Sequence, residues 1–323
     1  MSDERVLVTG AYGCIGAWVA RELLRDGSEV VAFDRGGDPY RLRYLLSDAE
    51  LARITHVAGD VADIAAVRAA VAEHGVTHVI HLAALQVPFC AADPPLGALV
   101  NVVGTVNVFE AVKGTPAAEH PIAYSSSVAA YDALDDPLAR PGEPSGRPSS
   151  HYGVYKFANE GSARVFARDD GLASIGIRPS VAYGVGRDQG KTSSPTQAML
   201  AAARGEPFEI DFGGACQLQH ARDIARAFIA AARSERVGAH VVDLGGPVTP
   251  LEEVVAAIRR VDPAAGERIS VAGPPLPFPE DLSDAAAREV LGPLPQTPLD
   301  DGVAETIERF RALIASGIIP ASQ

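Results

Sequence analysis

The feature that most constrains this chain is a set of glycines between its first apolar run and its first helical pattern. Gly10, Gly13 and Gly16 follow the apolar residues 5–9 and open a helical pattern over residues 14–26. In a strand–turn–helix unit, the first glycine permits a tight turn, the second lets a ligand approach the backbone, and the third lets the helix pack against the sheet. Because the N–H groups and dipole of a helix N-terminus favour an anion, this spacing predicts a site for the pyrophosphate of a dinucleotide.

An acidic residue closes the next apolar run, and it bears on which dinucleotide is bound. Asp34 ends the run at residues 29–34. A carboxylate there accepts hydrogen bonds from the ribose 2′- and 3′-hydroxyls and repels a 2′-phosphate, so NAD is favoured over NADP. The adjacent Arg35 leaves a phosphate contact open, although it can equally be a solvated loop charge.

Short apolar runs alternate with amphipathic runs through the first half of the chain. The apolar runs cover residues 5–9, 29–34, 54–59, 78–82, 122–125 and 174–179, and the helical patterns cover residues 14–26, 64–73, 96–113 and 151–169. Alternation of this kind builds βαβ units, so we expect an α/β fold with a doubly wound parallel sheet of the Rossmann class. A loop rich in Pro, Gly and Arg is expected at residues 137–148.

The character of the chain changes after Tyr183. Residues 184–194 are polar and rich in glycine, as a substrate loop would be. Helical patterns follow at residues 196–204, 222–234, 250–260, 282–290 and 299–316, and a strand at residues 240–244 is expected to return to the main sheet. We expect residues 1–178, with about 214–247, to form an NAD-binding Rossmann domain, and residues 179–213 and 248–323 to form a smaller C-terminal α+β substrate domain.

The bulk composition excludes several classes of function. The formal net charge of −13 disfavours binding to nucleic acid, because a phosphate backbone would be repelled. The three cysteines are far apart, at Cys14, Cys90 and Cys216, so neither a metal site nor a disulfide framework is expected and a reducing, cytoplasmic location is favoured. The first strand begins by Arg5, which leaves no room for a signal peptide, and no stretch approaches 18 apolar residues, so no membrane span is expected.

A tyrosine and a lysine stand four residues apart at the start of the helical pattern over residues 151–169. Tyr152 and Lys156 therefore share one helix face, and a nearby cation is expected to lower the pKa of the tyrosine to make it a general acid/base. Alone, this spacing also fits a packed tyrosine beside a solvated lysine. The three serines at residues 125–127 end the fifth apolar run, where ligands bind in parallel sheets, and a hydroxyl there can hydrogen-bond a substrate alcohol or carbonyl.

Together these residues resemble the extended short-chain dehydrogenase/reductases, the group that includes the NAD-dependent epimerases and dehydratases. The resemblance runs over nearly the whole chain. It rests on the glycine loop, Asp34, Asp60-Val61, His81-Leu82-Ala83-Ala84, Asn101 with Gly104-Thr105, Ser127, Tyr152 with Lys156, and Arg178-Pro179 before Tyr183-Gly184.

The resemblance implies roles for individual residues. Ser127, Tyr152 and Lys156 would form the catalytic set, with Ser127 chosen among the serines because it lies four residues before Tyr131. The implied NAD-binding residues are Gly10, Tyr12, Gly13, Cys14, Ile15, Gly16, Asp34, Arg35, Asp60, Val61, Leu82, Ala83, Ala84, Asn101, Ser125, Tyr152, Lys156, Pro179 and Val181. The helices at residues 96–113 and 151–169 match those of a four-helix homodimer contact in the family, with apolar surface from Ala163, Val165, Phe166 and Ala167.

Departures from the family pattern narrow the chemistry. Val128 and Ala129 follow Ser127 where dehydratases of the family carry acids, which disfavours dehydration. The arginine that pairs with a nucleotide-sugar diphosphate is replaced by Cys216, with Arg187 or Arg222 as possible substitutes, and a substrate-binding asparagine is replaced by Ser180. Both changes lower the odds of a nucleotide sugar. The candidate substrate residues are Gln86, Ser127, Ser180 and Arg187.

Three hypotheses about function follow. The leading one is an NAD-dependent oxidoreductase that transfers hydride at a secondary hydroxyl carbon of a carbohydrate or sugar acid. The alternative is a nucleotide-sugar epimerase that retains its NAD. The third is a non-catalytic NAD(P)-sensing protein, against which the intact Ser127, Tyr152 and Lys156 argue. A small-molecule substrate is expected in each enzymatic case, and no metal is expected.

Overall fold

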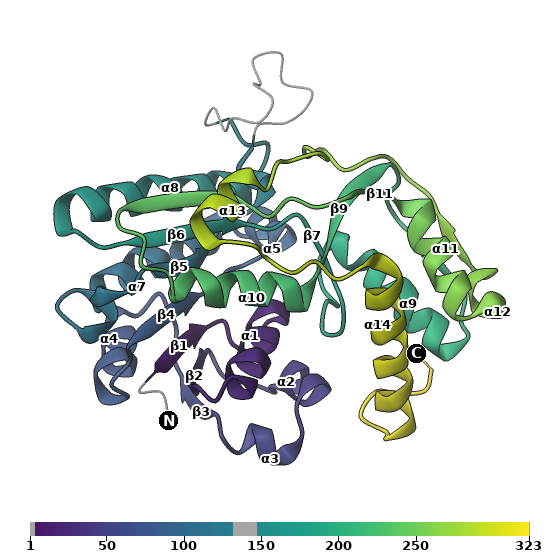
Figure 1. Ribbon diagram of the computed structural model, residues 1–323, viewed down its shortest axis with the longest axis horizontal. Helices are drawn as coiled ribbons and strands as arrows, with labels where there is room; N and C mark the ends of the chain where they lie inside the picture. Colours follow the sequence, from purple (N-terminus) through teal and green to yellow (C-terminus); the bar gives the residue numbers. More distant parts are fainter. Residues whose placement is uncertain (1–3, 132–146, 323) are drawn as a thin grey trace.

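The computed structural model describes residues 4–131 and 147–322, so the predicted loop at residues 137–148 lies outside the described residues up to residue 146. A sheet of parallel strands forms the centre of the molecule (Figure 1). Its strands are β1 (Arg5–Thr9), β2 (Glu29–Asp34), β3 (Thr55–Ala58), β4 (His78–His81), β5 (Ile122–Ser125), β6 (Ser174–Arg178) and β10 (Ala239–Asp243). The spatial order β3-β2-β1-β4-β5-β6-β10 confirms the predicted Rossmann fold and puts the topological switch point between β1 and β4.

Helices cover both faces of this sheet, and the alternation of side chains along β1 shows why. Val6 and Val8 belong to one buried cluster while Leu7 belongs to another, because successive strand residues point to opposite faces. The first face is covered by α1 (Cys14–Arg25) and α10 (Ala221–Ala232), which pack on each other. The second is covered by α4 (Ile64–Glu73), α7 (Gly104–Val112) and α8 (His151–Asp170).

The helix predicted at residues 96–113 begins earlier and changes its winding. It follows α5 (Val87–Ala92) and consists of α6 (Pro94–Ala98), a π-helical stretch at Leu99–Val103, and α7. Contrary to the prediction from composition, the run Pro94–Val112 is long and apolar enough, by length and mean hydropathy alone, to cross a membrane. More than half of it is buried inside the protein against the sheet, as in the core helix of a Rossmann fold.

The remaining elements pack beside the carboxyl edge of the sheet (Figure 1). They include the sheet β11-β9-β7 and the pair β12-β8, whose three- to six-residue strands the sequence did not predict. The strands are β7 (Val181–Tyr183), β8 (Phe208–Ile210), β9 (Ala215–His220), β11 (Val248–Pro250) and β12 (Ile269–Val271), and the helices are α9 (Ser194–Arg204), α11 (Leu251–Val261), α12 (Pro263–Gly266), α13 (Ala285–Leu291) and α14 (Leu299–Ala315). The helix predicted at residues 282–290 is α13, which begins three residues later and ends one residue later. The domain boundaries stay a prediction.

Short helices complete the chain. Two of them, α2 (Tyr40–Leu45) and α3 (Asp48–Leu51), link β2 to β3, and 3₁₀ turns lie at Pro116–Glu119, Val128–Ala130 and Lys191–Ser193. In α3 the Ser47 and Glu50 side chains form a reciprocal capping box, which explains why so short a helix forms there.

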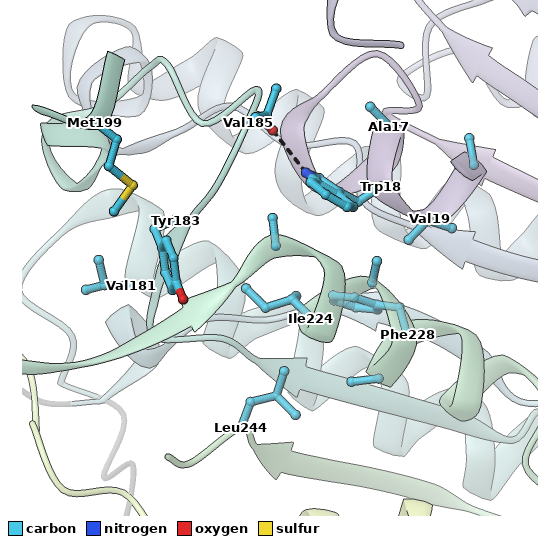
Figure 2. Packing of buried hydrophobic residues seen from close by; sticks show 14 of the residues in the cluster. Ala17, Trp18, Val19, Val181, Tyr183, Val185, Met199, Ile224, Phe228 and Leu244 are labelled. Carbon is cyan, nitrogen blue, oxygen red and sulfur yellow. Dashed lines mark hydrogen bonds between the residues drawn. The ribbon is translucent and has the colours of Figure 1, made fainter. Parts of the chain in front are cut away.

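One buried cluster joins the first face of the sheet to the C-terminal elements. Figure 2 shows Trp18 of α1 among these residues, with its indole Nε1 donating to the backbone oxygen of Val185 at 2.9 Å. Tyr183, Ile224 and Phe228 belong to the same cluster. The indole hydrogen bond therefore ties the loop after β7 to the helix that follows the glycine loop.

Candidate active site

The glycine loop has the geometry that a dinucleotide phosphate requires. Gly10 has φ +69°, and a Cβ there would lie 2.7 Å from the backbone nitrogen of Ala83. A Cβ on Gly16 would overlap the Gly10 carbonyl oxygen, so only glycine lets α1 begin this close to β1. Gly13 caps α1, and no described side chain caps its first N–H groups. The first turn of α1 thus fits a pyrophosphate group.

A cleft of about 580 Å³ opens at this loop. Eleven of the predicted NAD-binding residues line it: Gly10, Tyr12, Gly13, Cys14, Asp34, Arg35, Asp60, Val61, Leu82, Ala83 and Ala84. The predicted substrate residues Gln86 and Arg187 line it as well. The cleft therefore runs from the end of β2 across the switch point, where a dinucleotide binds in this fold.

Asp34 lies at the end of the cleft where an adenosine ribose is expected. Its carboxylate accepts hydrogen bonds from the backbone nitrogens of Tyr12, at 3.0 Å, and Arg35, at 2.8 Å. Burial raises the pKa of Asp34, and these two hydrogen bonds oppose that shift. The bonds fix the carboxylate, and each oxygen keeps a further lone pair for a ribose hydroxyl.

Three predicted catalytic side chains meet where β5 ends against α8. The Ser127 hydroxyl hydrogen-bonds the Tyr152 side chain. Lys156 is 3% exposed, and its Nζ donates to the backbone oxygen of Ser125 at 2.7 Å while lying 5.5 Å from the Tyr152 ring centroid. Ser150 caps α8 by accepting from the Gly153 nitrogen, which places Tyr152 in the first turn.

The prediction that Lys156 lowers the pKa of Tyr152 is wrong for the protein without a bound cofactor, in which this pKa is raised. Burial of the phenol raises the pKa of Tyr152, and the hydrogen bond with Ser127 and the charge of Arg187 offset only part of that rise. Lys156 is itself affected, because burial of the ammonium lowers its pKa to about 8. The reason is desolvation, which disfavours the charged form of both groups.

Comparison with known proteins identifies the family. Residues 6–245 match the model of the NAD dependent epimerase/dehydratase family. The chain belongs to this family.

The UDP-glucose 4-epimerase of Mycolicibacterium smegmatis is 30% identical over 320 residues, covering 95% of this chain and 98% of that enzyme. UDP-glucuronate 4-epimerase 4 of Arabidopsis thaliana is 31% identical over 185 residues, covering 55% of this chain and 42% of the plant enzyme. A crystal structure of the Thermus thermophilus UDP-glucose 4-epimerase complexed with NAD has a TM-score of 0.77 at 25% identity, over 95% of this chain and 99% of that one.

This membership confirms the predicted family, enzyme class and cofactor, and the chain is an NAD-dependent enzyme. The cleft and glycine loop fit NAD on their own geometry. Among the described residues, no group of three or more His, Cys, Asp or Glu side chains is arranged to hold a metal ion.

Eight predicted NAD-binding residues do not line this cleft: Ile15, Gly16, Asn101, Ser125, Tyr152, Lys156, Pro179 and Val181. Asn101 is buried, and its amide bonds both the nitrogen and the oxygen of Leu85, so it holds the cleft wall rather than facing the cleft. His81 is likewise buried, and its ring nitrogens hydrogen-bond the hydroxyls of Thr9 and Thr105.

The two substitutes for the family's missing arginine differ in their surroundings. Arg222 donates to both carboxylate oxygens of Glu305, at 2.9 and 2.7 Å, and to the Thr297 hydroxyl, so it is engaged away from the cleft. Arg187 lines the cleft, and its charge acts on both Cys14 and Tyr152. The Cys216 thiol is buried in β9, and burial raises its pKa to about 12.

The structure adds cleft residues that sequence reasoning missed. Arg41 donates to the carbonyls of Tyr12 and Gly186 and pairs with Asp188 at 2.6 Å. It therefore clamps the loop after β7 onto the glycine loop. Residues 41 and 188 are far apart in the sequence and neither belongs to a motif, so no local signal could have linked them. The side chain of Phe89, on α5, also lines the cleft.

Proposed function

We propose that this enzyme epimerises a secondary carbinol carbon of a nucleotide sugar and retains its NAD through the cycle. The observation that carries the proposal is the contact of Ser127 with Tyr152, with Lys156 one helical turn further on. Arg187, which lines the NAD cleft, acts on Tyr152 through its charge. Epimerisation needs one proton-transfer group and one cofactor, and a single Ser/Tyr/Lys set meets that need.

Each member of the set has a distinct proposed role. Tyr152 accepts the hydroxyl proton of the substrate and later returns it, and Ser127 orients the reacting oxygen. Lys156 binds the nicotinamide ribose with its ammonium. Bound NAD supplies the hydride acceptor and a cationic ring. Burial raises the pKa of Tyr152. A further positive charge beside the phenol opposes that rise, because it favours the ionised form of the tyrosine.

The proposed substrate class follows the named activities of the relatives, which act on UDP-glucose and UDP-glucuronate. A second candidate is the dehydrogenation of a smaller carbohydrate or sugar acid. Cys216 favours it, since a buried thiol in β9 offers no charge to a diphosphate. Arg187 lines the cleft together with Arg35 and Arg41. We assign Arg187 to the pyrophosphate of the cofactor because its charge acts on Cys14 at the start of α1.

The test is to incubate purified protein with UDP-hexoses, UDP-hexuronates and the free sugars, following epimers by NMR and NADH by absorbance. We expect epimers of a UDP-sugar to form while free NADH does not accumulate. Stoichiometric NADH with a keto product would instead favour the dehydrogenase. Tyr152→Phe should abolish turnover while NAD still binds, and full activity in that variant would refute the assigned role of Tyr152 and revive the sensing hypothesis.

A homodimer is proposed through the helical run at Pro94–Val112 and α8. Leu99, Val154 and Val165 are 44%, 45% and 47% exposed on these elements, which suits a shared apolar contact. Of the residues first named for this contact, Ala163 and Phe166 face the core instead, since both are buried. A cytoplasmic location is proposed with it, because Cys14, Cys90 and Cys216 are all free thiols.

A further inference from the structure

Three consecutive serines end β5, and each is joined to α8. The Ser125 carbonyl accepts from Lys156 Nζ at 2.7 Å, the Ser126 hydroxyl donates to Glu160 Oε1 at 2.5 Å, and the Ser127 hydroxyl bonds Tyr152. The three helix partners are spaced four residues apart, so they lie on one face of α8. Only Glu160 among them stands outside the proposed catalytic set.

Glu160 is a buried carboxylate in a bidentate ion pair. It is 1% exposed, and the Arg178 guanidinium of β6 donates to it twice, from Nε at 2.8 Å and from Nη2 at 2.7 Å. A buried ion pair is favourable only where geometry is good and further hydrogen bonds are present, and here Ser126 supplies one.

The network continues across the sheet. Arg178 Nη1 donates to the Tyr131 hydroxyl at 3.1 Å, and that hydroxyl donates to Asp243 Oδ2 at 2.7 Å. These contacts tie α8 to the segment that follows β5, to β6 and to β10. A shift of α8 along the sheet would break several of them at once, so the network fixes the position of α8.

The same carboxylate acts on Lys156 through its charge. Burial lowers the pKa of Lys156, while Cys90 and Glu160 act in the opposite direction. Among the described residues, the titratable groups recorded as interacting with Lys156 are Tyr152 and Glu160 on its own helix, Cys90 from α5 and His81 from β4. Burial raises the pKa of the Cys90 thiol and lowers that of His81 to about 3, so both are neutral near pH 7. Glu160 is the anion left to favour the ammonium.

We propose that Glu160 is a positioning residue of this active site, which sets the register of α8 against the serine run and favours the ammonium form of Lys156. The inference rests on the proposed function for its effect on turnover. Its effect on the charge of Lys156 does not depend on the substrate. The experiment therefore has two arms.

The first arm measures kcat and the Kd for NAD in Ser126→Ala and Glu160→Gln. Losing one hydrogen bond to a charged group is expected to lower kcat about tenfold in Ser126→Ala, with the Kd for NAD within about twofold of wild type. Ser162→Ala is the matched control, because that hydroxyl donates to the Ala158 carbonyl of its own helix and is outside the network around Glu160. If Ser126→Ala keeps the wild-type kcat, Glu160 does not set the register of α8 through Ser126. This outcome is decisive even if Glu160→Gln does not fold.

The second arm needs no substrate. The difference in unfolding free energy between the Lys156 protein and its Lys156→Met partner is followed against pH, first with Glu160 present and then with Glu160→Gln. The pH at which Lys156 titrates in the folded protein is expected to fall by about one unit when Glu160 loses its charge, and to stay in place with Glu160→Asp. No movement in Glu160→Gln would overturn the charge role. A wild-type protein that turns over no nucleotide sugar would refute the proposed function and leave this arm decisive.

Discussion

Replacing Lys156 with methionine should make the protein's stability less dependent on pH. Lys156 is 3% exposed, and burial lowers its pKa from 10.5 to about 8. Because the folded pKa lies below the unfolded one, the unfolded chain binds more protons between these values. Below about pH 8 the free energy of unfolding of the wild type is therefore lowered by the full cost of burying a charged lysine. This cost disappears as the pH rises toward about 10.5, so the wild type becomes more stable.

The size of the effect follows from the shift. A folded pKa of about 8 against 10.5 in the unfolded chain makes the full penalty for burying the charged Lys156 about 3 kcal/mol. Roughly 2 kcal/mol of it should be relieved between about pH 7 and pH 9.5. Methionine fills a similar volume but leaves the Ser125 carbonyl without its donor, at a cost of about 1–3 kcal/mol. Near pH 7 the variant should thus be as stable as wild type or up to about 2 kcal/mol more stable.

The assay is urea unfolding of both proteins at the two pH values, with NAD removed because a ligand would add its own stabilisation. The free energy of unfolding of Lys156→Met, relative to that of wild type, should fall by about 2 kcal/mol from the lower to the higher pH. Lys191→Met is the control, and its difference from wild type should not change with pH because that side chain is exposed. A difference for Lys156→Met that is equal at both pH values would refute the burial argument.

Three further predictions concern the cofactor and the assembly. Arg187→Met should weaken NAD binding, measured by calorimetry, about tenfold or more, as loss of a charge-assisted contact does. The control Arg222→Met should leave NAD binding unchanged, because Arg222 is bound to Glu305. If Arg187→Met raises only the KM for the substrate, Arg187 contacts the substrate and not NAD. Asp34→Ser should narrow the preference for NAD over NADP in binding titrations, since the anion that repels a 2′-phosphate is removed, and an unchanged preference would contradict its role. Leu99→Glu should give a monomer by light scattering where the wild type is a dimer, and a wild-type monomer would refute the dimer itself.

The central sheet was predictable because its signals are local. The strands from β1 to β6 are short apolar runs, and the helices between them carry their own amphipathic pattern, so neighbouring residues alone indicate the order of elements. The short strands β7, β9 and β11 were missed. β7 and β11 have only three residues each, and β9 carries two glutamines and a histidine where the central strands carry apolar residues. No local apolar run therefore marks these strands, and they exist here because they pair with one another.

In the candidate site, too, local spacing predicted which residues take part, but not the groups that surround them in the fold. Spacing placed Tyr152 and Lys156 on one helix face, but spacing does not reveal what lies opposite that face. The Ser125 carbonyl takes the ammonium, and burial acts on both groups, so the pKa of Tyr152 moves upward and not downward. A sequence motif thus names groups that can exchange a proton, whereas the direction of their pKa shifts depends on desolvation. For the same reason Glu160 carries no motif of its own, although it is the anion that offsets the cost of burying Lys156.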